Sequence, residues 1–208
     1  MEIWEDKSFQ DEDFGERDFS EFVFRRCSFE HCRFVGAILS EALVEICHFE
    51  ECNFSGAQMN AFSARGSSFS SSVFRGTYFF VAAFTDCRLL GADFLDADLS
   101  GITISNGDWS WVNLRRQKLD KISFRGLKLV ESDFYATSLK NTDFRDTDLT
   151  RAEFRDADLT GADFRGAILD KVDLRTWNLK GVRFDIAQAI QLAQCYGVRI
   201  EEDNVRSG

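Results

Sequence analysis

Large apolar residues recur at every fifth position along most of this chain. The series starts at Phe9 and runs in steps of five, without an insertion or deletion, to Phe184. Of its 36 positions, 19 are Phe and 12 are Leu, so only three of the 22 phenylalanines lie outside it. A helix repeats its apolar positions about every 3.6 residues and a strand every 2. A period of five therefore predicts a short extended segment followed by a turn, repeated along the chain.

A second, smaller residue accompanies each large one. Two positions before the large residue the chain carries mostly Cys, Ala, Ser or Thr, as at Cys27, Ala97 and Ser132. We expect one large and one small side chain per unit to point inward, and the other three to face solvent. The 208 residues include no Pro, which fits a chain whose backbone N–H groups are committed to ladders, because Pro lacks this donor.

The clearest units, AEFRD, ADLTG and ADFRG over residues 152–166, resemble the A-(D/N)-L/F-x-x unit of pentapeptide-repeat proteins. The resemblance implies an all-β solenoid, a right-handed quadrilateral β-helix in which four repeats form one coil and residues i and i+20 stack. At the parallel-strand spacing of about 4.8 Å, nine coils would form a rod on the order of 43 Å long. We assign residues 1–184 to this solenoid. Within it, we interpret residues 102–127, where large residues occupy the small positions, as a waist between two coil stacks.

The pattern changes after Phe184. Asp185 is a good N-cap residue, and the apolar spacing predicts a helix over 186–196 that ends at Gly197. One narrow stripe of this helix is Gln and the rest is apolar, more than capping the last coil requires. Residues 198–200 alternate like a short strand. We assign residues 185–201 to dimerisation and residues 202–208 to a flexible tail. The predicted dimer interface comprises Ile186, Ala189, Ile190, Leu192, Ala193, Tyr196 and Val198.

The sequence predicts no catalytic, metal or cofactor site. Five of the six Cys occupy the small inward positions, which indicates packing and free thiols in a reducing compartment. The two His, His31 and His48, face outward on different repeats without a nucleophile in a recognisable motif. Glycines occur singly at turns rather than in a phosphate-binding loop. The carboxylates are spread along solvent-facing ladders and do not converge in a pocket.

The charge is distributed unevenly along the chain. Residues 1–100 contain 18 acidic and 8 basic residues, whereas residues 101–208 contain 17 of each, so the net charge of −10 belongs to the first half. Over about five coils this is one net charge per ~2.4 Å of rod, against one per about 1.7 Å in duplex DNA. Such acidity argues against direct nucleic-acid binding and favours a basic partner surface. The candidate partner-binding residues are Asp11, Glu12, Asp13, Glu16, Asp18, Glu21, Asp93 and Asp98.

Both ends of the chain are similar to Qnr-type quinolone-resistance proteins. The similarity lies in MEI, FQDEDF and FRRC near the N-terminus, and in residues 173–198, which resemble the dimerisation end of Qnr and MfpA. It implies a cytoplasmic, rod-shaped homodimer that mimics duplex DNA, binds DNA gyrase or topoisomerase IV, and protects them from quinolones. Qnr proteins interrupt their coils with two loops. The unbroken register from 9 to 184 leaves no room for such a loop and is more like MfpA.

Two alternative functions are also compatible with the sequence. A self-immunity protein against a gyrase-poisoning antibiotic would use the same mechanism. A scaffold for another protein would instead use outward apolar residues on a rod whose core is already filled. We expect no membrane partner and a cytoplasmic location, because no run of 18 apolar residues occurs and the N-terminus does not resemble a signal peptide. The outward apolar residues are Val35, Ile38, Leu43, Val73, Tyr78, Phe80, Leu90 and Leu95.

Overall fold

The structure is a computed structural model that describes residues 2–201, so the predicted tail at 202–208 lies outside the described residues. Its short strands form a parallel six-stranded sheet, β1-β3-β5-β7-β8-β9, and a parallel three-stranded sheet, β2-β4-β6. A 3₁₀ turn and one α-helix follow near the C-terminus. The bounds are β1 Ile3–Glu5, β2 Ser8–Gln10, β3 Val23–Arg25, β4 Ser28–Glu30, β5 Leu43–Glu45, β6 His48–Glu50, β7 Ser63–Arg65, β8 Ala83–Arg88, β9 Thr103–Asp108, η1 Leu174–Thr176 and α1 Ile186–Cys195.

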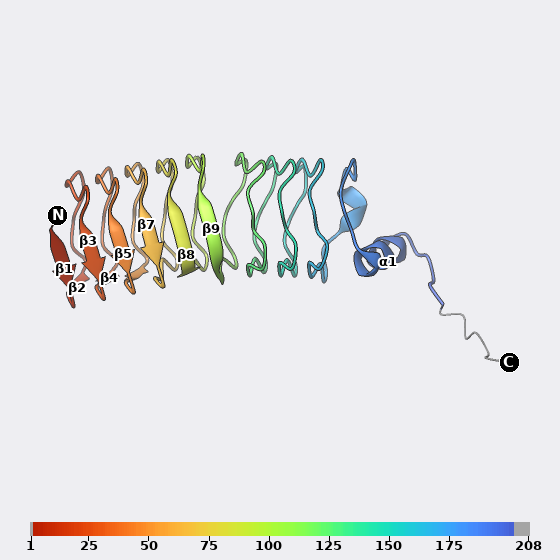
Figure 1. Cartoon of the computed structure of the whole chain (residues 1–208), viewed down its shortest axis with the longest axis horizontal. Coiled ribbons are helices and arrows are strands. Elements are labelled where there is room, and N and C mark those ends of the chain that lie inside the picture. The colour runs from red at the N-terminus through yellow and green to blue at the C-terminus, as the bar shows by residue number, and fades with distance from the viewer. Residues whose placement is uncertain (1, 202–208) are drawn as a thin grey trace.

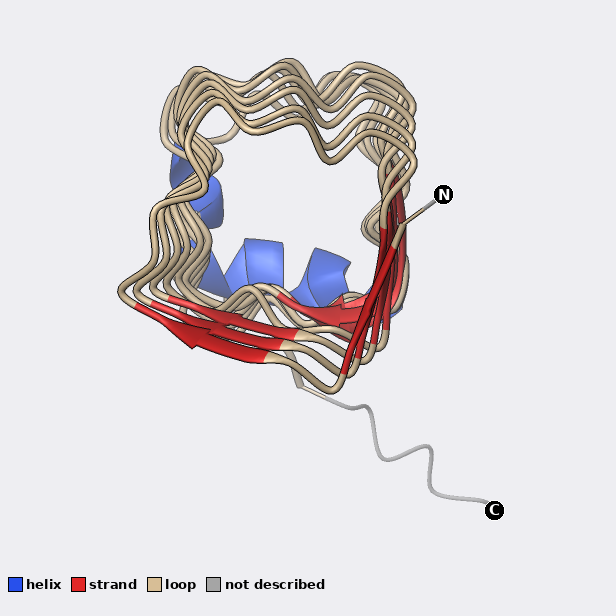
Figure 2. Cartoon of the chain, turned by 90° about the vertical axis from the view of Figure 1, so that its left-hand side faces the viewer, coloured by secondary structure: helices blue, strands red, loops and turns tan. Residues whose placement is uncertain are grey.

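Successive strands of each sheet pair at an offset of 20 residues. The pairing begins with Ile3 opposite Val23, and isolated parallel bridges continue the same offset to Asp163 opposite Arg183. Rungs of chain therefore stack along the long axis (Figure 1), and their cross-section is roughly square (Figure 2). The molecule is a β-solenoid with a short C-terminal helix, as the repeat pattern predicts.

The residues of the five-residue series form one continuous core. All of them are buried except Phe9, Ile104, Leu179 and Phe184. Rings one coil apart stack face to face. The ring centroid of Phe49 lies 4.6 Å from that of Phe29 and 4.9 Å from that of Phe69, and the ring planes are nearly parallel. The core is thus built from columns of side chains that run along the rod.

The small residues occupy the space between neighbouring coils. Where they are Thr, the hydroxyl donates a hydrogen bond to the carbonyl 23 residues earlier, as from Thr77 to Phe54 at 2.7 Å and from Thr137 to Leu114 at 2.7 Å. Phe62 is the exception expected from the sequence, because it lies beside the undersized Ala64. Its side chain is buried and replaces the missing volume.

The corners of the coils place every fifth residue in the left-handed region. Non-glycine residues with φ of 50–64° recur there, and glycines occupy other corners of the same series. Gly107 lies outside this series, with φ of 119°. A Cβ at this position would overlap the backbone carbonyl of Cys87, so only glycine fits.

The ladder is interrupted between residues 96–106 and residues 115–125, and again near η1, where residues 153 and 158 do not pair with residues 173 and 178 among the described residues. Tyr78 pairs with Asp98, but the equivalent pairs of Asp98 with Lys118 and of residue 103 with residue 123 do not form among the described residues. The pairing resumes at Asp108 and Lys128. Figure 1 shows the wider separation directly after β9. This interruption overlaps the stretch 102–127 that the sequence distinguishes by its large residues at small positions.

Gln117 bridges the interruption from a position where neighbouring coils carry Ala or Thr. Its buried amide Nε2 donates to the carbonyl of Phe94 at 2.6 Å, the same offset of 23 residues that the Thr hydroxyls use. The longer side chain makes this hydrogen bond across a wider gap. A Gln in place of Thr therefore connects two coils whose backbones are too far apart to form the hydrogen bonds of the ladder.

The C-terminal region confirms the predicted helix and adds an unexpected turn. Helix α1 begins at Ile186, as predicted, after the N-cap Asp185, whose side chain forms a capping box with Gln188. It ends at Cys195, one residue earlier than predicted. The preceding turn η1 was not evident from the sequence. It places Trp177 at a small position, where its ring lies 5.0 Å from Phe154. No helix among residues 2–201 is long and apolar enough to span a bilayer.

The short strand expected at residues 198–200 is not present in the single chain. These residues have no regular secondary structure. They follow the end of α1, beyond the last coil, where no edge of the same chain pairs with them. A strand at this position would need a second chain as its partner.

Candidate interaction surface

The acidic residues predicted near the N-terminus all lie exposed on the first coil. Asp11, Glu16 and Glu21 occupy three successive corners, each with φ near 57°. The coil therefore distributes its carboxylates around three corners and does not gather them into a pocket. Such an arrangement favours a long-range negative field over a specific binding site for one cation.

Most of these carboxylates are not neutralised by a neighbour. Asp13 pairs with Arg33 at 3.2 Å, and Asp11 lies 3.7 Å from His31. Glu12, Glu16, Asp18 and Glu21 make no ion pair within residues 2–201. In the first hundred residues, the acidic residues that pair with Arg or Lys are Glu5, Asp6, Asp13, Glu45 and Asp93.

The two acidic candidates further along the rod differ from each other. The side chain of Asp93 is only 17% exposed and accepts hydrogen bonds from Arg75 at 2.6 Å and Asn113 at 2.7 Å. It stabilises the ladder and is poorly placed to contact a partner. Asp98 is exposed, and within residues 2–201 its carboxylate accepts only from the N–H of Ser100, at 3.0 Å. Of the two, Asp98 is the residue that a partner can reach.

The second half of the rod neutralises its own acidity. Asp143, Asp163 and Asp173 each bind the Arg two residues later, at 2.7–2.8 Å. Hydrogen bonds from that Arg lower the pKa of each carboxyl, for Asp173 to about 2. These groups stay ionised but are charge-balanced locally, so the negative field of the molecule originates mainly from its N-terminal half.

One column of outward residues in the N-terminal half is uncharged. The outward residues at the centre of the six-stranded sheet are uncharged, and Ile3 and Leu43 are 48% and 44% exposed. Phe80 and Val81, on the corner before β8, are 59% and 54% exposed. The neighbouring column of the same sheet is charged but largely balanced, because Arg25 pairs with Glu5 at 3.8 Å and with Glu45 at 2.8 Å. The outward residues of this sheet are Ile3, Val23, Leu43, Ser63, Ala83 and Thr103.

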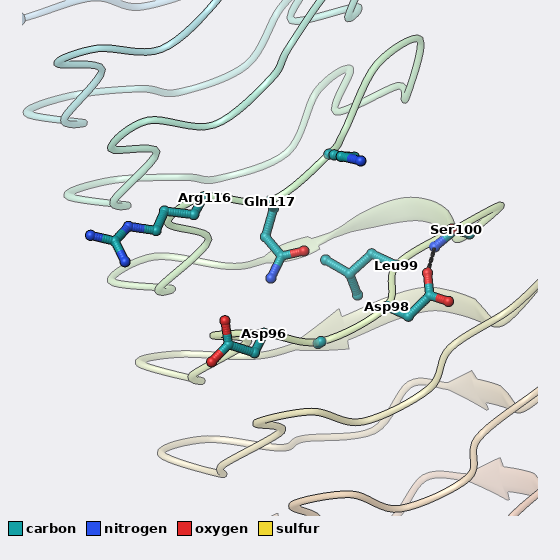
Figure 3. A pocket seen from close by; sticks show the side chains of 8 residues that line it. Asp96, Asp98, Leu99, Ser100, Arg116 and Gln117 are labelled. Atoms are coloured by element: carbon teal, nitrogen blue, oxygen red, sulfur yellow. Dashed lines mark hydrogen bonds between the residues drawn. The ribbon is translucent and has the colours of Figure 1, made fainter.

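A cleft of about 430 Å³ opens where the ladder is interrupted (Figure 3). Residues 96–100 form its lower lip and residues 116–118 its upper lip. Asp96 and Asp98 therefore lie on the lip opposite Arg116 and Lys118, and no ion pair within residues 2–201 joins the two lips. In Figure 3 the side chain of Gln117 reaches toward the lower coil, whereas Arg116 points away.

Helix α1 docks on the last coil through its polar side. Gln188 donates to the carbonyl of Ala167 at 2.9 Å, and Gln191 donates to Leu169 at 2.6 Å. These amides satisfy backbone groups at the open end of the solenoid, where a further coil would otherwise pair. The sequence showed the Gln stripe but not that it faces the coil.

This docking leaves much of the predicted dimer interface exposed. The exposed fraction is 80% for Ile186, 65% for Tyr196 and 51% for Val198. Ala189 is also exposed, and Ile190 and Ala193 are half-buried. Leu192 differs from the others because it packs against the core of its own chain. The exposed apolar side of α1 is unpartnered within residues 2–201.

The cysteines behave as packing residues. Five are buried free thiols and Cys195 is half-buried. Burial raises the pKa of Cys47 and Cys87 to about 11 and that of Cys52 to about 12, which suppresses the reactive thiolate. No group of three metal-ligating side chains occurs among residues 2–201.

Thiol titration should therefore distinguish one cysteine from the other five. With Ellman's reagent at pH 8, we expect Cys195 alone to react within minutes in the folded protein. All six thiols should react after unfolding in urea, because burial is then lost. Rapid reaction of two or more thiols in the folded protein would contradict the packing described above.

Comparisons with known proteins agree with the repeat architecture. The family model described as Pentapeptide repeats matches eight copies over residues 110–146, 137–175 and 147–185. Full-length QnrB1, a plasmid-mediated fluoroquinolone resistance protein, has a similar structure at a TM-score of 0.84 and 23% identity, covering 94% of this chain and 100% of that one. A trypsin-treated QnrB1 variant gives 0.80 and 23%, covering 97% and 100%.

A more distant likeness involves HetL, a pentapeptide-repeat protein involved in heterocyst differentiation regulation in the cyanobacterium Nostoc sp. strain PCC 7120. It aligns at a TM-score of 0.50 and 20% identity over 87% of this chain and 86% of that one. No curated protein sequence matches the chain. At these identities the similarity concerns the fold.

Proposed function

Because this chain is built of pentapeptide repeats, we propose that it is a non-enzymatic DNA mimic that binds a type II topoisomerase, DNA gyrase or topoisomerase IV. Binding would modulate the enzyme or protect it from quinolones. The observation that carries the proposal is the row of unpaired carboxylates along the N-terminal half of a rod. The shared fold with QnrB1 supports the choice of partner.

The dimensions of the rod support mimicry of a short DNA duplex. Ladder partners 20 residues apart extend from Ile3 to Arg183, which supports the count of about nine coils and a length of roughly 43 Å. A surface that binds the phosphate backbone is basic and attracts acidic surfaces over several ångströms. The six-stranded sheet combines an uncharged column with a largely ion-paired one, so the unpaired carboxylates elsewhere on the coils would face the basic groove of the enzyme.

We further propose that two chains join through the exposed side of α1. The 80% exposed Ile186 and the 65% exposed Tyr196 would be covered in such a dimer. The strand expected at residues 198–200 would then form by pairing between the chains. The acidic N-terminal ends would point away from each other, as two arms. A partner that acts on bacterial chromosomal DNA places the protein in the cytoplasm.

A gyrase supercoiling assay tests the proposal. Purified protein at micromolar concentration is expected to inhibit supercoiling or to relieve its inhibition by ciprofloxacin, and the effect should weaken as salt is raised. The double variant Glu16→Gln/Glu21→Gln should weaken the effect several-fold. Its matched control, Asp156→Asn/Asp170→Asn, changes the net charge equally but on the half without net charge. No effect of the unmodified protein in either assay, well above micromolar, would refute the proposal.

Exposed apolar side chains favour a second candidate function, a scaffold for another protein. Leu43, Tyr78 and Phe80 are each 44–59% exposed on a rod whose core is complete. Affinity capture from a cell lysate should then recover a stable partner other than a topoisomerase. Leu43→Ser should abolish that capture. Recovery of topoisomerase subunits alone would favour the first function.

A further inference from the structure

The two lips of the cleft carry backbone groups whose equivalents are paired in the adjacent coils below and above. One coil below, Asp98 donates to the carbonyl of Thr77 at 2.8 Å and accepts from the N–H of Phe79 at 2.8 Å. At the cleft, the equivalent bonds from Lys118 to Ala97 and from Leu99 to Lys118 do not form within residues 2–201. The N–H groups of residues 96 and 101 also lack a backbone partner there.

Unpaired edges of this kind readily accept another strand. Backbone groups away from a ladder must bind water, a side chain or an added strand. The cleft, at about 430 Å³, lies within the usual size range of binding pockets. One coil below the lower lip, Tyr78 pairs with Asp98, and the side chains of Tyr78 and Phe80 are exposed.

We propose that an extended segment of the topoisomerase enters this cleft and adds to both lips as a parallel strand. Three consecutive residues of such a segment would pair with the carbonyl of Ala97, the N–H of Leu99, and the N–H and carbonyl of Lys118, the mode of recognition known as β-augmentation. An apolar side chain of the segment would pack on Tyr78 and Phe80. This inference rests on the proposed function and names the surface that recognises the partner.

The charges of the lips define the chemistry of that segment. The lower lip presents two carboxylates, Asp96 and Asp98, and the upper lip presents the cations Arg116 and Lys118. Because none of the four is paired across the opening, a segment that carries both a basic and an acidic side chain is complementary to the cleft.

A variant that closes the cleft tests the inference without changing the net charge. The next coil carries Thr137 and Thr142 at the positions of Gln117 and Ile122, and both Thr hydroxyls bond across a regular ladder. The double variant Gln117→Thr/Ile122→Thr is therefore expected to bring the lips together. The dissociation constant for purified gyrase should rise at least tenfold. Gln58→Thr, an exposed change on the same side but in a paired coil, should leave it unchanged.

Hydrogen exchange of the unmodified protein provides a second readout that does not depend on a folded variant. The amides of residues 96, 99, 101 and 118 should exchange rapidly in the free protein and slow markedly when gyrase is added. Unchanged affinity of a folded closed variant, or no slowing of these amides in the complex, would overturn the inference while the proposed function stands. Failure of the unmodified protein to bind gyrase would overturn both.

Discussion

Replacing Phe49 with alanine is expected to lower the free energy of unfolding by about 3–5 kcal/mol. The Phe49 ring is buried and lies between Phe29 and Phe69, at centroid distances of 4.6 and 4.9 Å. Its removal leaves a cavity and also loses two aromatic contacts, each worth about 0.5–1.5 kcal/mol. The loss is a large part of the roughly 5–15 kcal/mol that stabilises a typical domain. The urea midpoint, followed by tryptophan fluorescence, measures it.

Phe80 provides the matched control for this prediction. It is one of the few phenylalanines outside the five-residue series, and 59% of it is exposed. Phe80→Ala is therefore expected to change the stability by less than about 0.5 kcal/mol. Equal losses at the two positions would show that the five-residue series does not determine which rings stabilise the coil.

Replacing Ile186 with glutamate is expected to convert a dimer into a monomer. Ile186 is 80% exposed in the single chain, on the side of α1 that faces away from the coil. In a dimer the new carboxylate would be buried without a partner, which typically costs several kcal/mol. Light scattering should report about twice 23.8 kDa for the unmodified protein and the single-chain mass for the variant.

This substitution should leave the single chain folded. A carboxylate in the first turn of a helix interacts favourably with the helix dipole, and the Gln188 and Gln191 contacts that dock α1 are untouched. The control Ala187→Glu adds the same charge in the same turn, beside the groove that faces the last coil. It should remain dimeric. A single-chain mass for the unmodified protein would contradict the predicted interface.

The sequence was sufficient to predict the solenoid because the same pattern of inward residues recurs in every repeat. One large inward residue in every five defines which side chains pack, and the change after Phe184 marks the start of α1. The spacing between coils was not predictable in the same way. It depends on how one coil accommodates a long side chain at a small position, and Gln117 solves this through a hydrogen bond to Phe94 across an open gap.

The surface was predicted less completely than the core. Exposure of the acidic residues follows from their positions in the repeat, whereas their pairing depends on side-chain conformations in neighbouring coils. Asp93 and Asp98 occupy equivalent positions, yet only Asp93 is held by Arg75. The orientation of α1 was not predicted, for a related reason. A stripe of Gln in a sequence suggests a side that faces solvent, but here the Gln side chains complete the hydrogen bonds of an open sheet edge.

Because the coils pair at a fixed offset of 20 residues, the fold can be conserved while the surface residues change. Only two side chains in each unit point inward, so the remaining three can mutate while the coil persists, which is consistent with 23% identity to QnrB1 at a TM-score of 0.84. Charge can accumulate on one coil and vanish from the next without a change of fold. A lineage of such rods can therefore acquire new partners by surface substitution alone. The addition or loss of whole coils, in steps of 20 residues, would change only the length of the rod.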